Sequence, residues 1–312
     1  MEIWYFETSA INELLNTLSN EDGLATRFLQ LSKGRDWRIS PVTLWEILMT
    51  ADEKRRDKII HFCQHLFSRE LLPSPGELII PYIEQGLPKS EDYRELVSNT
   101  AIADTWRDLV DNRDKCFIID YKEITKRVKM LQTLTKDIQK IIKHHDLVID
   151  RCSPAVHTEI LLSNLVLKLN FVKSDNLISK EDLLSYKVSL HLIIVLLCAE
   201  GDLDNEIIKM FWKKRGIFST IDRIKYVIEE LPTLVHRGPF MLMAYMAIAQ
   251  AKASYSRGVW FDGLHSIYIT YADKVFTSDN HFRALRESIP EPLLKMRIHH
   301  LDEVGLSYVN KK

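Results

Sequence analysis

The sequence of 312 residues has little glycine, proline or cysteine, and each shortage excludes a class of protein. Ten glycines and ten prolines are few for this length, which disfavours an all-β chain with many turns and favours long helices. No two cysteines form a Cys-x-x-Cys motif, so their spacing indicates neither a zinc site nor a disulfide framework. The four cysteines are Cys63, Cys116, Cys152 and Cys198.

Long apolar runs and an excess of positive charge are also missing. The longest apolar run lies within Leu190 to Ala199 and is too short to cross a bilayer. The first residues lack the basic region of a signal peptide. We therefore expect a reduced, soluble, cytoplasmic chain with no membrane partner. With a net charge of −1 the chain has no global basic field, so local patches or a bound cation would have to hold nucleic acid.

The composition is that of a folded, helix-rich protein. Apolar residues make up 46% of the sequence and charged residues 27%, which predicts a real core and excludes general disorder. Helical spacing of apolar residues dominates from about residue 90 to 235, with one strand-like run at 116–120. Within it, segments 122–143 and 209–225 are rich in Lys and Arg. Two interpretations of these basic faces stay open: solvated helix surfaces, or a surface that follows nucleic-acid phosphates.

Segments near the two ends of the chain predict short buried strands, each followed by a helix. The apolar run 3–6 predicts a strand, and Thr8 or Ser9 is expected to cap the next helix. Residues 37–39 predict a second strand, after which Pro41 fits the first turn of a helix. Further along the chain we expect a helix over 241–254, a helix opened by Asp262, a strand over 274–277 and a final strand within 296–301.

Four acids stand where these strands end or near where these helices begin: Glu7, Glu46, Asp262 and Asp279. The carboxyl ends of parallel strands lie along one edge of a sheet, so we expect the four side chains to converge there. Carboxylates this close repel one another unless a hard cation such as Mg²⁺ or Mn²⁺ neutralises them. Such a cation activates water and stabilises charge on a phosphodiester, which predicts phosphodiester hydrolysis. Each acid alone would be interpreted as a helix cap, a turn residue or a surface charge, so the hypothesis rests on the set.

The order and local sequence of these segments resemble the PIN domain nucleases. Phe6-Glu7-Thr8-Ser9 is similar to the family's first strand with its Asp-Thr-Ser. The stretch from Ile39 to Glu46 is similar to the strand and helix that bear the family's glutamate. Asp262, followed by the stretch from Ala272 to Phe282, is similar to its C-terminal pattern: an Asp that opens a helix, a short strand, and Thr-x-Asp or Thr-x-Asn before Phe. This C-terminal match is the most specific part of the resemblance.

Two positions depart from the family pattern. Glu7 stands where the family usually has Asp, and its extra methylene displaces the carboxylate by about one C–C bond, a shift that matters because metal sites tolerate little misplacement. His281 stands where some PIN families have an acid, so Asp279 is expected to supply the last acid. Other histidines are interpreted as structural or surface residues rather than ligands: His61, His65, His265, His299 and His300.

The resemblance implies an α/β, PIN-like parallel-sheet domain built from both termini, residues 1–80 plus 240–312, with a large all-helical insertion over 81–239. It implies a metal-dependent endoribonuclease acting on RNA, in a toxin–antitoxin system or in phage defence, with a protein inhibitor or antitoxin and homo-oligomers as partners. Three alternatives stay open: a structure-specific DNA nuclease, a catalytically degenerate module that binds nucleic acid or protein, and a helical scaffold without a parallel sheet, in which the resemblance is accidental. The implied ligands of Mg²⁺ or Mn²⁺ are Glu7, Glu46, Asp262 and Asp279.

Overall fold

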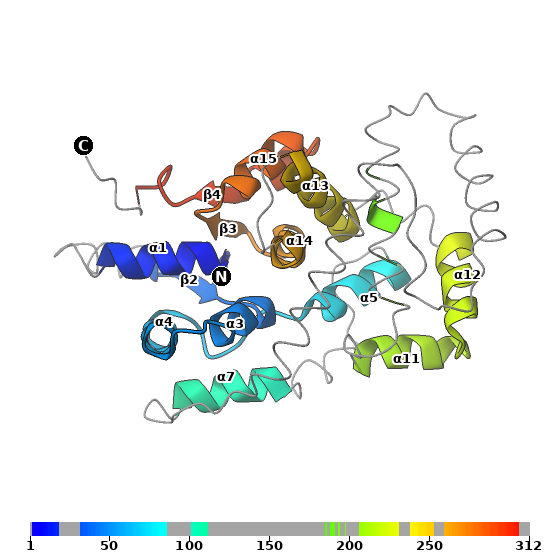
Figure 1. Cartoon of the computed structure of the whole chain (residues 1–312), viewed down its shortest axis with the longest axis horizontal. Coiled ribbons are helices and arrows are strands. Elements are labelled where there is room, and N and C mark those ends of the chain that lie inside the picture. Colours follow the sequence, from blue (N-terminus) through cyan, green and yellow to red (C-terminus); the bar gives the residue numbers. More distant parts are fainter. Residues whose placement is uncertain are drawn as a thin grey trace.

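The structure of the chain is a computed structural model, drawn in Figure 1. The blue elements from the start of the chain and the red elements from its end lie next to each other in this view. The strand-like run expected at 116–120 and the basic segment 122–143 lie outside the residues that the structure describes. The structure describes residues 2–18, 32–85, 101–111, 185, 188–190, 193, 197, 206–230, 238–252 and 259–305.

A sheet of four parallel strands forms the centre of the fold, in the order β2-β1-β3-β4. β1 and β3 lie side by side although they come from opposite ends of the chain, with Tyr5 paired to Val275. The prediction of an α/β fold is therefore confirmed, and both ends of the sequence contribute strands to one sheet. The strands are β1 (Glu2–Phe6), β2 (Arg35–Arg38), β3 (Lys274–Thr277) and β4 (Ile298–His300).

Side chains of β1 alternate between the two faces of the sheet, and helices cover both faces. Tyr5 belongs to one buried apolar cluster, whereas Trp4 and Phe6 belong to another. Successive strand residues point to opposite faces, so this division follows from the two-residue period of a strand. A parallel strand buried on both faces requires a continuous apolar run, which the segment Ile3 to Phe6 provides.

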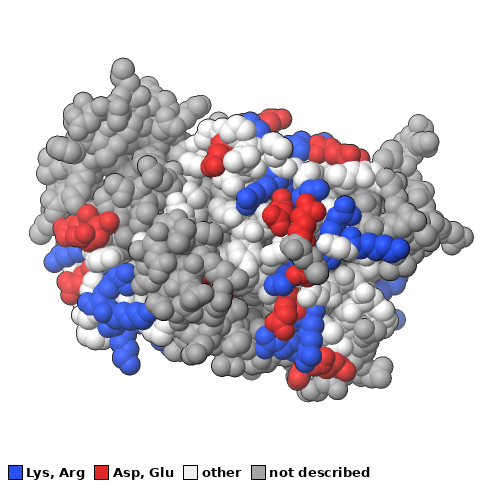
Figure 2. All heavy atoms as spheres, turned by 180° about the vertical axis from the view of Figure 1, so that it is seen from behind, with Lys and Arg blue, Asp and Glu red and all other residues white. Residues whose placement is uncertain are grey.

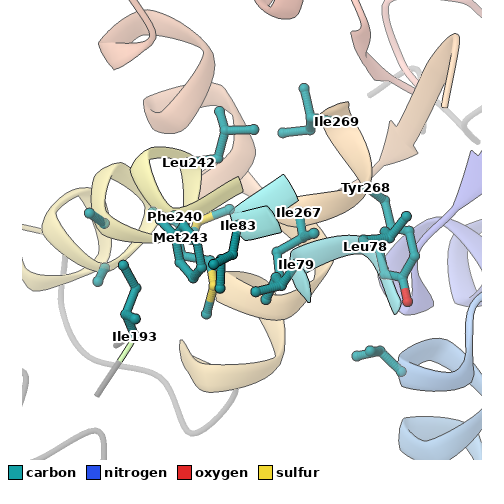
Figure 3. Packing of buried hydrophobic residues seen from close by; sticks show 14 of the residues in the cluster. Leu78, Ile79, Ile83, Ile193, Phe240, Leu242, Met243, Ile267, Tyr268 and Ile269 are labelled. Carbon is teal, nitrogen blue, oxygen red and sulfur yellow. The ribbon is translucent and has the colours of Figure 1, made fainter. Parts of the chain in front are cut away.

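The cluster that contains Tyr5 is formed by side chains of helices from both halves of the sequence, some of which Figure 3 shows. Phe240 and Met243 of α13 lie beside Ile83 of α5, and Tyr268 lies near Leu78. All five side chains are buried, and each contributes about 1.5–3 kcal/mol by leaving water. The elements of this cluster include α5 (Pro75–Gln85), α13 (Gly238–Lys252), α14 (Val259–Ile267), η2 (Tyr268–Thr270) and α15 (Asn280–Ser288).

Aromatic rings dominate the cluster on the other face of the sheet. The ring centroids of Phe6 and Phe276 lie 4.7 Å apart, and those of Phe6 and Trp37 lie 4.8 Å apart. Aromatic pairs at such distances add about 0.5–1.5 kcal/mol beyond the area that they bury. The helices that contribute to this cluster are α1 (Thr8–Leu18), α3 (Pro41–Leu48), α4 (Glu53–Leu66) and α7 (Ala101–Asp111).

The start of α3 agrees with the prediction, whereas the start of α1 does not. Ser40 caps α3 through its hydroxyl, and Pro41 occupies the first turn as predicted. The prediction that Thr8 or Ser9 caps α1 is wrong. The side chain of Glu7 takes this role, because its carboxylate folds back onto amides of the first turn.

Two further details near the end of the chain differ from the prediction. Asp262 lies within the first turn of α14, which already includes Val259, so it does not open the helix. His300 is buried rather than at the surface, because it lies in β4 and pairs with Thr277 of the neighbouring strand. The final strand is otherwise where it was predicted, since Ile298–His300 falls within 296–301.

The division of the chain at residues 81 and 239 stays a prediction. α5 continues through residue 81, and side chains of α5, α11 and α13 belong to one apolar cluster. Within the ranges that the structure describes, no helix is long and apolar enough to cross a membrane. The remaining helices are α11 (Glu206–Arg215), α12 (Thr220–Glu230) and α16 (Pro292–Lys295).

Candidate metal centre

The loops that follow β1 and β3 are tied together at one edge of the sheet. The amide of Glu7, directly after β1, donates to the carbonyl of Phe276 at 3.2 Å. The amide of Ser278, directly after β3, donates to the hydroxyl of Ser9 at 2.9 Å. These hydrogen bonds bring the start of α15, where Asp279 lies, next to the start of α1.

Asp262, Asp279 and His281 form a group whose geometry suits a metal ion. Each residue offers one donor atom, and these atoms all lie within 4.8 Å of one another. The His281 Nδ1 atom lies 3.3 Å from Asp262 Oδ2 and 3.2 Å from Asp279 Oδ1. In the part of the chain that the structure describes, no other three Asp, Glu, His or Cys side chains meet this condition.

The start of α15 orients two of these three side chains. Asp279 is the N-cap of α15, and its Oδ1 accepts a hydrogen bond from the amide of His281 at 2.7 Å. The amide of Asp279 itself donates to the hydroxyl of Thr277 at 2.9 Å. A cap of this kind satisfies an amide that has no partner within the helix. It also sets the position from which the His281 side chain leaves the helix.

Asp262 is buried on α14, in surroundings that disfavour its charge. Burial raises the pKa of Asp262, and the negative charges of Asp279 and Glu46 raise it further. The hydrogen bond with His281 and the charge of His265 act in the opposite direction but do not cancel the effect. A carboxylate in this position is therefore stabilised by any additional positive charge that enters the group.

Gln250 on α13 contacts the same carboxylate. Its side-chain amide donates to Asp262 Oδ2, and the residue is 1% exposed. The other atom of this amide, Oε1, is buried and has no hydrogen-bond partner among the described residues. A buried oxygen without a partner costs about 1–3 kcal/mol, and such an oxygen suits a hard cation or the water around it.

Glu46 joins the group from α3. The Glu46 Oε2 atom accepts a hydrogen bond from the hydroxyl of Thr8 and lies 2.7 Å from His265 Nε2. His265 is completely buried, and its Nδ1 atom contacts the hydroxyl of Tyr5. The imidazole therefore bridges β1 and α3 from its place on α14.

The charge of His265 is favoured by the acids around it. Burial lowers its pKa, but the charge of Glu46 and the hydrogen bond to Glu46 raise it, as do the charges of Glu7 and Asp262. The net result is a pKa for His265 above its usual value. A protonated imidazole here offsets part of the repulsion among the acids.

Glu7 lies at the same edge but uses its carboxylate locally. Its Oε2 accepts from the amide of Ser9 at 2.7 Å, and its Oε1 accepts from the amide of Ala10 at 3.2 Å and from the hydroxyl of Ser9. Burial raises the pKa of Glu7, although the charge of His265 and these hydrogen bonds lower it in part. The carboxylate is thus also held by the partial positive charge at the N-terminus of α1.

The four predicted acids therefore fall into three environments at one edge of the sheet. Asp262 and Asp279 form a group with His281. The charge of Glu46 acts on Asp262, and its carboxylate contacts His265 on the same helix as Asp262. Glu7 caps α1. Their joint role as ligands stays a prediction.

Two histidines at this edge were not included among the expected ligands. His265 was interpreted as a structural or surface residue, and it is completely buried against Glu46. His281 was noted only for replacing an acid. The signal that was available was its place two residues after Asp279, at the start of a helix. His61 and His65 lie with their ring centroids 4.5 Å apart, outside the group described above.

Comparisons with protein-family models, with curated proteins and with solved structures each gave no match.

Proposed function

We propose that the chain is a metal-dependent nuclease of the PIN type that hydrolyses phosphodiester bonds in RNA. The observation that carries the proposal is the convergence of Asp262, Asp279 and His281 at the edge where the parallel strands end. Ligands bind at this edge in open α/β sheets. The sequence resemblance at both ends of the chain supports the same conclusion.

The residues present fit a divalent cation. Two carboxylates lie within reach of one ion, and burial together with the charge of Asp279 raises the pKa of Asp262. Carboxylates are the ligands that Mg²⁺ and Mn²⁺ prefer. Gln250 donates to Asp262 through its side-chain amide, and the Oε1 atom of the same amide is buried without a partner among the described residues.

Each residue has a separate task in the proposed mechanism. Asp262 and Asp279 hold the cation, which supplies the positive charge that polarises a phosphodiester and activates water. Glu46, held by Thr8 and His265, provides a further negative group at the edge of the site. Glu7 keeps α1 in place beside the loop that contains Asp279, and it is the fourth acid at this edge of the sheet.

RNA is proposed as the substrate because of the family resemblance and one surface feature. The last turn of α11 is basic and contains Lys213, Lys214 and Arg215. Phe218, three residues after Arg215, is 72% exposed and offers a ring on which a base can stack. Figure 2 shows a group of Lys and Arg at its lower left, the side on which α11 lies once the view of Figure 1 is reversed.

The biological setting proposed from the resemblance is a toxin–antitoxin system or phage defence in the cytoplasm. In such a setting a protein inhibitor or antitoxin controls the nuclease. Homo-oligomers are proposed on the same ground.

Cleavage of matched oligonucleotides tests the proposal. The full chain is incubated with end-labelled RNA and with DNA of the same sequence, in Mg²⁺, in Mn²⁺ and in EDTA. We expect RNA cleavage that requires a cation and disappears in Asp262→Asn and Asp279→Asn. Glu287→Gln, which changes an exposed acid on the same helix as His281, should cleave like the wild type. Preferential cleavage of DNA would instead identify the structure-specific DNA nuclease.

One observation favours a second function, a module that binds nucleic acid or protein without cleaving it. Both oxygens of Glu7 are taken by the first turn of α1, which is the use of a helix cap rather than of a metal ligand. RNA binding without cleavage in either cation, together with no bound metal, would support this alternative and refute the nuclease.

A further inference from the structure

We propose that His281 is a direct ligand of the metal, together with Asp262 and Asp279, and that this donor set selects a transition-metal dication such as Mn²⁺ over Mg²⁺. The inference rests on the proposed metal site and deepens it, because it names a nitrogen ligand that the four-carboxylate hypothesis does not contain. It also predicts which cation the protein takes when both are present.

The distances within the group are those of ligands that share one ion. Ligand atoms that bind an octahedral ion at about 2.1 Å from adjacent positions lie about 3.0 Å apart. The His281 Nδ1 atom lies 3.3 Å from Asp262 Oδ2 and 3.2 Å from Asp279 Oδ1. All three donor atoms lie within 4.8 Å, so a shift of less than about 1 Å brings the most distant pair to the ~4.2 Å that opposite ligands span.

The position of His281 is fixed by the same contacts that fix Asp279. The amide of His281 donates to the Asp279 side chain at 2.7 Å, so the two potential ligands leave one helix start in a set relation. The side chain of His281 is 13% exposed and that of Asp279 is 32% exposed. The site is therefore open on this side to water and to a substrate phosphate, as a catalytic metal site has to be.

A second observation concerns the buried amide side chain that contacts Asp262. Gln250 is 1% exposed and donates to Asp262, yet its Oε1 atom is buried with no hydrogen-bond partner in the described part of the chain. Such an oxygen is costly unless an ion or its bound water occupies the space beside it.

The chemistry of the donor set decides which cation is favoured. Mg²⁺ takes oxygen ligands almost exclusively and keeps several waters, whereas imidazole is a good ligand for first-row transition metals. One imidazole beside two carboxylates therefore shifts preference away from Mg²⁺. Mn²⁺ accepts carboxylate and imidazole together and serves as the probe.

A different role for His281 makes the opposite prediction. As a protonated counter-ion to Asp262 and Asp279, it would compete with the metal for the two carboxylates. Its removal would then strengthen the binding of both Mn²⁺ and Mg²⁺. Removal of a ligand would weaken Mn²⁺ binding by at least about tenfold and change Mg²⁺ binding much less, since even outer-shell partners of metal ligands are worth about 10–100-fold.

The experiment titrates the full chain with Mn²⁺ and follows free Mn²⁺ by electron paramagnetic resonance, with Mg²⁺ as competitor. We expect Mn²⁺ to bind at least about tenfold more tightly than Mg²⁺ in the wild type. His281→Gln should lose this preference, and His281→Asp should bind Mg²⁺ and Mn²⁺ more equally. His61→Gln, at an exposed histidine outside the group, is the matched control and should bind like the wild type. Circular dichroism checks that each variant is folded.

A measurement on the wild type alone keeps the inference testable if His281→Gln does not fold. Pulsed electron paramagnetic resonance of bound Mn²⁺ should detect coupling to an imidazole nitrogen. Absence of that coupling, or tighter Mn²⁺ binding in His281→Gln, would overturn the inference. Cation-dependent cleavage that His281→Gln leaves unchanged would refute the inference but not the nuclease. Mn²⁺ binding that depends on His281 without any cleavage would refute the nuclease alone.

Discussion

The His265 imidazole and the Glu46 carboxylate form a contact that joins α14 and α3 across 219 positions of sequence, with Nε2 2.7 Å from Oε2. His265 lies one helical turn after Asp262, so this contact fixes the distance between Asp262 and Glu46. Glu46 also contacts Thr8 on α1, and Asp262 also contacts Gln250 on α13, but these two contacts do not join α3 to α14. The contact therefore makes the geometry of the proposed site depend on a residue that need not touch a substrate.

Replacing His265 by Ala is expected to destabilise the fold by about 2–4 kcal/mol. The change removes the contacts of the imidazole with Glu46 and with the Tyr5 hydroxyl, although Thr8 still donates to Glu46 and the hydroxyls of Ser40 and Thr43 still lie 3.1 Å from that of Tyr5. For this reason, and because Glu46 is 19% exposed, the cost stays below that of breaking a fully buried pair. Urea unfolding followed by tryptophan fluorescence measures the loss. Thr8→Val removes the other hydrogen bond to Glu46 and should cost only about 1 kcal/mol. Equal losses in the two variants would contradict the central role of His265.

Asp262→Asn is expected to separate stability from activity. The pKa of Asp262 is raised above its ordinary 3.8, so its folded form loses stability as pH rises through that raised pKa when no metal is present. The amide variant lacks this loss, so at pH 8 in EDTA its unfolding free energy should exceed that of the wild type. Its cleavage of labelled RNA in Mn²⁺ should fall by at least about 100-fold. A variant that is both less stable and fully active would refute the assignment.

His300 is expected to make the fold sensitive to acid between pH 6.5 and about pH 4. Burial, together with the charge of Arg283, lowers the pKa of His300 from 6.5 to about 4. The unfolded chain therefore binds this proton first, and stability that is complete above pH 6.5 is lost progressively as pH falls toward 4, by up to about 3 kcal/mol. Chemical unfolding at several pH values measures the slope. His300→Gln should flatten it, whereas His61→Gln should leave it unchanged.

Gly238 is expected to tolerate no larger residue. Its φ is +58°, and a Cβ atom there would lie 2.5 Å from the ring of Tyr82. Gly238→Ala should therefore lose stability twice, by about 1–2 kcal/mol for the left-handed backbone and by about 1–3 kcal/mol for the overlap. Gly216→Ala has a similar φ of +66° but open space around it, so it should show only the first loss. Thermal unfolding of both variants tests the difference, and an equal effect would show that Tyr82 moves aside.

The strands at the two ends of the chain were predictable because each is a short apolar run that ends at polar turn residues. The segment 274–277 matches β3, and Asp279, which was expected where this strand ends, is the N-cap of α15. The cap of α1 was not predictable from local preference, since Ser and Thr cap helices far more often than Glu. In the fold the hydroxyl of Ser9 accepts from Ser278, so the Glu7 carboxylate takes the amides of the first turn.

The roles of His265 and His281 could not be predicted for a related reason. The environment of His265 depends on where α14 packs against α3, and sequence spacing carries no information about that contact. His281 is positioned by Asp279 at the start of the same helix. Its second neighbour, Asp262, lies on another helix, α14. Tertiary packing therefore decided which histidines join the acids, whereas local sequence indicated the acids themselves.

The pairing of β1 with β3 also has a consequence for how the protein is made. β1, β2 and Glu46 precede Asp262, β3 and Asp279 in the sequence, so they leave the ribosome long before them. Tyr5 can pair with Val275 only after the intervening chain has been made. Closing so long a loop is slow compared with local folding. A nascent chain, or one whose translation stops early, therefore contains no assembled centre. If the centre cleaves RNA, the ribosome and message that produce the protein are not exposed to it until synthesis has reached the last strands.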